Sequence, residues 1–281
     1  MYPEKYKPTR NLLRDNLNNF WNRDVEYYKQ ARDMNKQMTS DRKSLMDSLV
    51  PDQPVLDISS GTAENSMFVG GRNYFAMDIS FLALKMAKEY GNVFVTQADA
   101  YDLPIKEEAF YNIICTNSVE HFIFVEKAFK EMWRVLKKGG VLALIFPNYG
   151  DYFFRLPPSM ESKGATLKFK YFAKQLSRKL VLILGIKKFM FPIIYNPDVL
   201  SPKVGYKQDN DITYPPSAHE ISNYFKLCGA KNIKLNFYRF VFKKPVFKNL
   251  KTNLARIIRA IYYWIPLFKY QHCGFIIIRK Q

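Results

Sequence analysis

The sequence has few of the residues on which small cross-linked or metal-bound proteins depend. Only three cysteines occur in 281 residues, Cys115, Cys228 and Cys273, and none is paired at the spacing of a metal-binding motif. We therefore expect neither a disulfide framework nor a bound metal. The sequence also lacks any run of about 18 uncharged apolar residues, which excludes a transmembrane helix. Its charged N-terminus has no signal-peptide core, so we expect a cytoplasmic protein.

Glycine and proline are also scarce, at 12 and 15 residues, which excludes a collagen-like or low-complexity chain. Hydrophobic residues make up 48% of the chain and charged residues 24%, a balance typical of a folded globular protein. We therefore expect a packed domain with an elaborated cap.

Acidic residues are absent after Glu220, and the positive charge is concentrated in the C-terminal half. Residues 147–281 contain 24 Lys and Arg against six Asp and Glu, whereas residues 55–146 contain nine against eleven. A basic surface of this density attracts nucleic acid, acidic phospholipid or phosphorylated substrates. The alternative is a solvated basic face without a partner.

Strand and helix patterns alternate through the middle of the chain. Continuous apolar strands are predicted at residues 55–58, 74–77, 93–96, 110–116 and 141–146, with further strands at 232–240 and 274–279. Helices are predicted at 81–89 and at 125–136, the latter ended by the glycine pair 139–140. This pattern is typical of an α/β fold with a Rossmann-like, doubly wound, mostly parallel seven-stranded sheet.

The pattern divides the chain into four parts. Residues 1–50 form an N-terminal helical cap, 51–147 a ligand-binding core, 148–215 a basic insertion or lid on the substrate side, and 216–281 the part that completes the sheet. The last part begins with a helix over residues 217–229, where Ser217 and Glu220 have the spacing of a capping box.

A turn of small residues follows the first predicted strand. It contains Asp57 and Gly61, and Asp78 lies 21 residues after Asp57 at the end of the second strand. Such a turn lets backbone approach a ligand closely, and a carboxylate at this distance is typical of a ribose diol site. The residues therefore indicate a nucleoside-containing ligand; the alternative is an ordinary strand–turn–helix.

Five segments in order resemble the class I S-adenosylmethionine-dependent methyltransferases, particularly their quinone- and small-molecule-type branch. They are Asp57-Ile-Ser-Ser-Gly-Thr, Asp78-Ile-Ser, Gln97-Ala-Asp-Ala-Tyr-Asp-Leu-Pro-Ile, Asn117-Ser-Val-Glu-His and Arg134-Val-Leu-Lys-Lys-Gly-Gly. The resemblance covers about residues 50–147 and implies S-adenosyl-L-methionine as cofactor. It implies a cofactor site formed by Asp57, Ser59, Gly61, Asp78, Ile79, Asp99, Ala100 and Asn117.

The first motif departs from the family at two positions. The family usually has glycine where Ser59 stands, and often again at Ala63. If position 59 requires positive φ, its serine is strained.

His121 is the candidate catalytic residue, since the resemblance places the transferred methyl group after the fourth strand. An imidazole there could accept the proton of a hydroxyl nucleophile. The alternative is that His121 only packs near the cofactor, because methyl transfer can be accelerated by proximity and orientation alone.

The acceptor is expected to contact the basic insertion. Residues 163–190 contain eight Lys and Arg, no acidic residue, and interleaved Phe, Tyr and Leu, which is typical of a membrane surface contact or an anionic amphiphilic substrate. The stretch 251–270 repeats this pattern. A lid helix packed on the core is the alternative. Asp209, Asp211 and Tyr214 are candidate substrate-binding residues.

The sequence thus predicts methyl transfer to a small or lipid- or glycan-linked, anionic acceptor, with an anionic membrane surface as a further partner. One alternative is an RNA methyltransferase, since the positive charge of the C-terminal half suits contacts with phosphate. Nucleic acid is nevertheless disfavoured as a partner, because the segment after the fourth strand lacks an Asn/Asp-Pro-Pro-aromatic motif. The other is a non-catalytic adaptor of the same fold that binds membranes or proteins.

Overall fold

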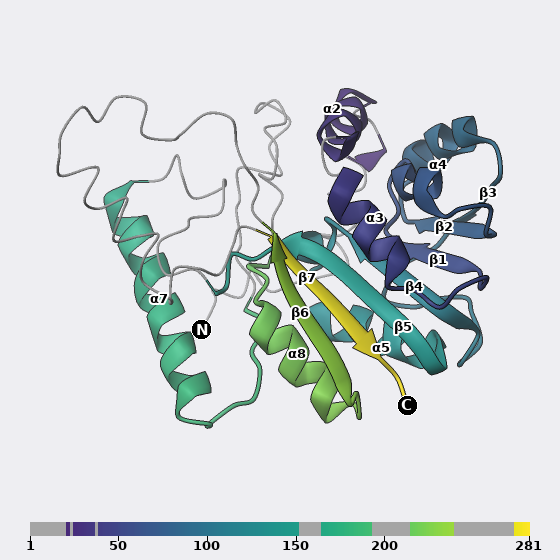
Figure 1. The fold of residues 1–281 in the computed structure, drawn as a ribbon. Coiled ribbons are helices and arrows are strands. Elements are labelled where there is room, and N and C mark those ends of the chain that lie inside the picture. The colour runs from purple at the N-terminus through teal and green to yellow at the C-terminus, as the bar shows by residue number, and fades with distance from the viewer. Residues whose placement is uncertain (1–20, 23–24, 37–38, 152–163, 193–213, 239–272) are drawn as a thin grey trace.

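The centre of the molecule is a seven-stranded sheet with helices on both faces (Figure 1). The computed structural model describes residues 21–22, 25–36, 39–151, 164–192, 214–238 and 273–281. The strand order is β3-β2-β1-β4-β5-β7-β6. The strands are β1 (Val55–Ile58), β2 (Tyr74–Asp78), β3 (Val93–Gln97), β4 (Phe110–Thr116), β5 (Leu136–Pro147), β6 (Asn232–Tyr238) and β7 (Cys273–Arg279).

Only β7 runs against the other strands. The pairs β1–β2, β1–β4, β2–β3 and β4–β5 are parallel, whereas β7 is antiparallel to both β5 and β6. The predicted mostly parallel, doubly wound sheet is therefore confirmed. Because the strand order reverses between β1 and β4, the carboxyl ends of these strands form the crevice in which such sheets bind ligands.

The two faces of the sheet are covered by different helices, and alternate residues of each strand point to opposite faces. In β5, Leu142, Leu144 and Phe146 belong to one core cluster, which includes side chains of α5 (Val125–Val135) and α8 (Ala218–Leu227). Residues Val141, Ala143 and Ile145 belong to the other, with side chains of α3 (Thr39–Asp47) and α4 (Phe81–Ala87). Burial on both faces explains why the strands are continuously apolar.

Three further features complete the described part. Helix α2 (Val25–Lys36) precedes α3 within residues 1–50, and α7 (Ala165–Ile183) lies within residues 148–215. Short 3₁₀ helices occur as η3 (Glu64–Phe68), η4 (Lys88–Tyr90) and η5 (Val119–His121). Among the helices that the structure describes, none combines the length and apolarity needed to cross a bilayer.

The glycine cap predicted for the helix between the fourth and fifth strands is wrong. Helix α5 ends at Val135, and β5 begins with the next residue, so the glycine pair lies inside an irregular start of β5 rather than at a helix cap. Gly139 has φ +77°, and a Cβ on Gly140 would lie 2.8 Å from the carbonyl oxygens of Lys137 and Tyr111. Gly139 thus allows a left-handed turn and Gly140 a close approach of backbone, roles that sequence spacing cannot distinguish from a helix end.

Candidate functional site

The loop after β1 is held against the end of β2 by backbone and carboxylate hydrogen bonds. The Ser60 amide donates to the Met77 carbonyl at 2.9 Å, and the Gly61 amide donates to Asp78 Oδ2 at 2.8 Å. The other oxygen of the same carboxylate, Oδ1, accepts from the Ser80 amide at 2.8 Å. The structure therefore brings together Gly61 and Asp78, two residues that the sequence predicts for one site.

Burial raises the pKa of the Asp78 carboxyl, while the amides of Ser80 and Gly61 favour its ionised form and limit the shift. Each carboxylate oxygen has a second lone pair beyond the one used by these amides. Asp78 can thus hold the loop and also accept a hydrogen bond from a ligand hydroxyl.

Four residues of the site have left-handed backbone, and three of them are not glycine. The φ angles are +57° at Ser59, +55° at Gly61, +61° at Ala63 and +52° at Asn117. Position 59 does require positive φ, so the serine that replaces the family's glycine is strained, and Ala63 is strained in the same way.

The loop after β4 closes against the loop after β1. The Ser118 hydroxyl donates to the Ser59 carbonyl oxygen at 3.0 Å, and the Asn117 amide donates to the Ile145 carbonyl oxygen at 2.7 Å. The left-handed Asn117 therefore lies at the edge that Ser59 and Gly61 also occupy, as the sequence predicts.

The side chain of Asp57 supports the loop after β1 through buried hydrogen bonds. Its side chain is fully buried, and Oδ2 accepts from Asn65 Nδ2 at 2.8 Å and from the Tyr74 hydroxyl. Arg42 of α3 donates to the Asn65 amide oxygen. Burial raises the Asp57 pKa to about 7, against the lowering effect of its hydrogen bonds and of Arg42. The described contacts of Asp57 are thus with the scaffold, and its predicted contact with cofactor stays a prediction.

Asp99 and Ala100 lie in a tight turn after β3. The Asp99 Oδ1 atom accepts from the Tyr101 amide at 2.9 Å, and the Ala98 amide donates to the Asp78 carbonyl oxygen at 3.0 Å. The Tyr101 hydroxyl in turn accepts from the Ile123 amide at 2.8 Å, which ties this turn to the segment after β4.

Ile79 lies between these turns. Its carbonyl oxygen accepts from Gln97 Nε2 at 3.0 Å, and its side chain packs partly against the core. Ile79 thus contacts the end of β3 through its backbone, and its predicted place in the cofactor site stays a prediction.

His121 ends the short helix η5, beside a buried carboxylate. Its Nε2 atom lies 3.9 Å from Oε1 of Glu120, whose side chain is almost completely buried, and the His121 side chain is 12% exposed. The backbone carbonyl of Glu120 accepts from the Tyr214 amide at 3.0 Å. This hydrogen bond joins the segment after β4 to the end of the basic insertion, so His121 and Tyr214 lie in the same part of the structure.

Of the three candidate substrate residues, the structure describes one. Tyr214 is completely buried, its ring makes an edge contact with Phe191 at 5.6 Å between centroids, and the Arg178 guanidinium lies 5.9 Å from its centroid. Burial raises the pKa of its hydroxyl. Asp209 and Asp211 lie outside the described residues.

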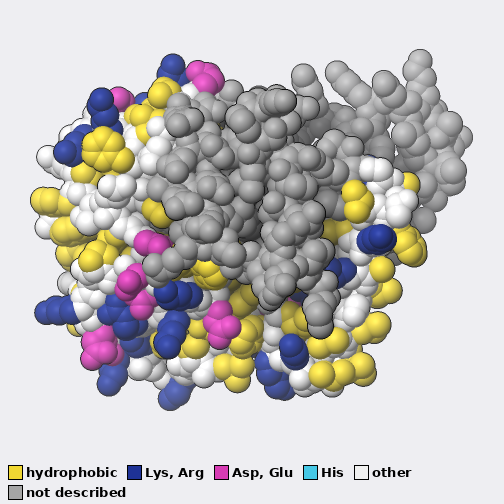
Figure 2. Space-filling view, turned by 180° about the vertical axis from the view of Figure 1, so that it is seen from behind, with side chains coloured by type: hydrophobic (Ala, Val, Ile, Leu, Met, Phe, Trp, Pro, Cys, Tyr) yellow, Lys and Arg dark blue, Asp and Glu magenta, His cyan; other side chains and the backbone are white. Residues whose placement is uncertain are grey.

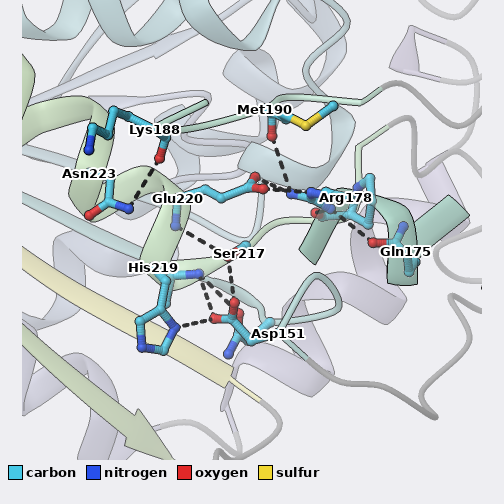
Figure 3. Close-up of polar contacts among 12 residues, drawn as sticks. Asp151, Gln175, Arg178, Lys188, Met190, Ser217, His219, Glu220 and Asn223 are labelled. Atoms are coloured by element: carbon cyan, nitrogen blue, oxygen red, sulfur yellow. Dashed lines mark hydrogen bonds and ion pairs between the residues drawn. The ribbon is translucent and has the colours of Figure 1, made fainter. Parts of the chain in front are cut away.

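Polar contacts at the start of α8 connect this helix to the end of β5 (Figure 3). Asp151 Oδ1 accepts from the Ser217 hydroxyl, and Oδ2 accepts from the Ala218 amide at 3.0 Å and lies 3.2 Å from His219 Nδ1. Although burial raises the Asp151 pKa, the hydrogen bond and charge of His219 lower it below its usual value. A carboxylate at a helix N-terminus is also favoured by the helix dipole.

The predicted capping box is half correct. The Ser217 hydroxyl accepts from the Glu220 amide at 3.2 Å, as expected of an N-cap. The Glu220 carboxylate instead forms a buried bidentate pair with Arg178 of α7 (Figure 3). Sequence reasoning placed Arg178 among the exposed basic residues; it is 3% exposed because it holds α7 to α8.

Residues 56–144 match a family model described as a methyltransferase domain. The matched residues contain all five segments that resemble the class I S-adenosylmethionine-dependent methyltransferases. Two relatives are similar to the chain: the ubiquinone/menaquinone biosynthesis C-methyltransferase UbiE of Vibrio campbellii (32% identical over 132 residues) and that of Citrobacter koseri (36% over 105). The matches cover 39% and 33% of this chain and 51% and 42% of the relatives, so the chain spans about half or less of their length.

Solved methyltransferase structures share the fold over nearly the whole chain. A S-adenosylmethionine-dependent methyltransferase from Thermotoga maritima is 14% identical with a TM-score of 0.52, covering 91% of this chain and 98% of that one. One from Archaeoglobus fulgidus is also 14% identical, with a TM-score of 0.51, covering 99% and 97%. The predicted Rossmann-like architecture is thereby confirmed.

The sequence missed the residues that support the methyltransferase loop. The carboxylate of Asp57 accepts hydrogen bonds from Tyr74 and Asn65, and Arg42 donates to Asn65. These three residues come from β2, η3 and α3, which are separate in the sequence. Tyr74 lies within an apolar strand, where a tyrosine is indistinguishable from a packing residue. Only the register, which pairs Val55 with Tyr74, places its hydroxyl next to Asp57.

Proposed function

We propose that this protein is an S-adenosylmethionine-dependent methyltransferase acting on a small, anionic acceptor. The observation that carries the proposal is the hydrogen bond from the Gly61 amide to the Asp78 carboxylate, which joins the carboxyl ends of β1 and β2 next to the switch point between β1 and β4. This contact lies within residues 56–144, the segment that matches a methyltransferase domain.

The residues at this edge fit the cofactor. A Cβ added to Gly61 would meet no protein atom within 4 Å, so there is room for a ligand against the loop backbone. Asp78 would hold the ribose hydroxyls, Asp99 and the Ala100 amide would hold the adenine, and Ser59, Gly61 and Asn117 would line the methionine end. When bound, S-adenosylmethionine supplies an electrophilic methyl group on a sulfonium.

The role proposed for His121 is to accept a proton from the acceptor's nucleophile. Its position beside buried Glu120 favours this role, because a carboxylate at 3.9 Å stabilises an imidazolium. The acceleration that does not depend on His121 comes from holding acceptor and donor in line, which can supply several kcal/mol.

The acceptor we propose is small, anionic and lipid- or glycan-linked. The support is the charge of residues 147–281, with 24 basic and six acidic residues, and the place of Tyr214 next to the segment that contains His121. The related UbiE proteins are named for ubiquinone and menaquinone biosynthesis, which favours a small-molecule acceptor.

The cofactor site is tested by calorimetric titration of S-adenosylhomocysteine into wild type, Asp78→Ala and a control, Asp47→Ala. Asp47 is an exposed carboxylate at the end of α3, so its loss changes charge without touching the site. We expect at least tenfold weaker binding to Asp78→Ala, about 1.4 kcal/mol, and wild-type binding to Asp47→Ala. If wild type fails to bind, the non-catalytic adaptor replaces this proposal.

The acceptor class is tested separately, by transfer of labelled methyl from S-adenosylmethionine to lipid, glycan and RNA fractions. Label in the lipid or glycan fraction supports the proposed acceptor, and His121→Ala should then lower kcat while leaving cofactor binding unchanged. Label in RNA alone, with binding that weakens steeply as salt increases, would establish the RNA methyltransferase instead.

A further inference from the structure

Helix α7 is attached to the rest of the protein by polar residues. The residues buried on its inward face are Tyr171, Gln175 and Arg178. Arg178 pairs with Glu220 and donates to the Met190 carbonyl oxygen, and Gln175 Oε1 accepts from Arg178 (Figure 3). The next residue, Lys179, donates from Nζ to the Asp151 carbonyl oxygen at 2.8 Å. These charged contacts fix which side of α7 faces the protein.

Several apolar residues of α7 face the solvent. Phe169, Leu176, Leu180 and Ile183 are 73%, 44%, 50% and 79% exposed. With Ala173, also exposed, they follow one another at steps of four, three, four and three residues, so they form one stripe on the side opposite Arg178. A helix of a globular protein normally has the reverse arrangement, with its apolar stripe buried.

The stripe continues beyond the helix end at Leu184 and Ile186, which are 70% and 68% exposed. Isolated exposed leucines need no explanation, but a continuous apolar stripe on one helix indicates an interaction surface. We call the five residues of the helix, together with Leu184 and Ile186, the α7 stripe.

Basic residues flank the α7 stripe on both sides. At 100° per residue, Lys168 lies on one flank and Lys170 on the other, and residues 163–190 contain no acidic residue. Figure 1 places α7 on the α8 side, far from α4. In the reversed view of Figure 2 this side shows apolar and basic side chains intermixed.

We propose that the α7 stripe docks the protein on the surface of an anionic phospholipid bilayer. Apolar side chains would enter the boundary between headgroups and acyl chains, while the flanking lysines reach lipid phosphates. Each lysine near such a surface contributes attraction, and their summed effect selects anionic over neutral lipid. A second copy of α7 is a poor partner, because it would set the same lysine flanks against one another.

Vesicle sedimentation tests this docking without any methyl donor, so its failure is distinguishable from failure of the methyltransferase proposal. The probes are vesicles of phosphatidylcholine alone and of phosphatidylcholine with 30 mol% phosphatidylglycerol, a composition about one-third anionic. We expect wild type to bind only the mixed vesicles. The variant Leu176→Gln/Leu180→Gln keeps the charge, and its partitioning should be at least about tenfold weaker, about 1.4 kcal/mol.

The matched control is Leu227→Gln, an equally polar change at a leucine 62% exposed on α8. Its partitioning should equal that of wild type, and circular dichroism checks that all variants are folded. Equal binding of wild type and Leu176→Gln/Leu180→Gln would show that charge alone attracts the protein and would overturn the proposal. Absence of vesicle binding, or a dimer in sedimentation velocity that the α7 substitutions dissociate, would overturn it as well.

Discussion

Replacing Ser59 with glycine should make the protein more stable, although it lies in the ligand loop. Its φ of +57° is a left-handed conformation that costs a non-glycine residue about 1–2 kcal/mol. Glycine adopts it freely but loses about 0.5–1 kcal/mol through greater freedom of the unfolded chain. The Ser118 bond to residue 59 is to its backbone carbonyl and survives. The net expectation is a gain of about 0.5–1 kcal/mol.

Two neighbours in the same loop provide matched comparisons. Gly61→Ala imposes the same strain at φ +55° in open space, so it should destabilise the protein by about 0.5–1 kcal/mol. Ala63→Gly relieves strain at φ +61° but removes a completely buried methyl group, worth about 0.8 kcal/mol, so its net effect should be near zero.

Urea unfolding of the three variants measures these differences as shifts in midpoint at constant slope. We expect Ser59→Gly to be the most stable, wild type and Ala63→Gly to be similar to each other, and Gly61→Ala to be the least stable. A loss of about 1 kcal/mol or more in Ser59→Gly would refute the reasoning, because it would mean that the serine side chain contributes more than its backbone strain costs.

Two further predictions concern buried charges. The folded-state pKa of Asp57 is about 7, above its ordinary 3.8, so the folded protein retains a proton that the unfolded chain loses, and stability falls as pH rises from about 4 to 7. In urea unfolding at pH 5 and 8, the stability of Asp57→Asn should therefore fall less than that of wild type. An equal fall in the two proteins would contradict the assignment. Arg178→Met should destabilise by about 3–5 kcal/mol because it leaves Glu220 buried without its partner, whereas Arg178→Met/Glu220→Leu should lose much less. Equal losses in the single and double variants would show that packing, rather than charge pairing, holds α7.

Local sequence patterns predicted most of the fold because they act within a few residues. The continuous apolar runs correctly located β1 and β4 with their observed bounds, and Ser217 correctly marked the start of α8. The spacing of Asp57, Gly61 and Asp78 indicated the ligand edge, since parallel strands bring their carboxyl ends together. Those signals depend on strand period, helix capping and chain direction, which are readable from one sequence.

Only the tertiary structure decided which residue among several of the same type is buried and paired. Among the basic residues of 164–192, the part of the insertion that the structure describes, Arg178 alone is buried against Glu220, because α8 lies within reach of that face of α7. The same packing turned the apolar residues of α7 outward. The left-handed backbone at Ser59 is likewise not a local preference of serine: it lies in a loop that is held by the Ser60 bond to β2 and by the Ser118 hydroxyl from the loop after β4. Contacts between distant segments overrule local preference wherever they are worth more than its cost of about 1–2 kcal/mol.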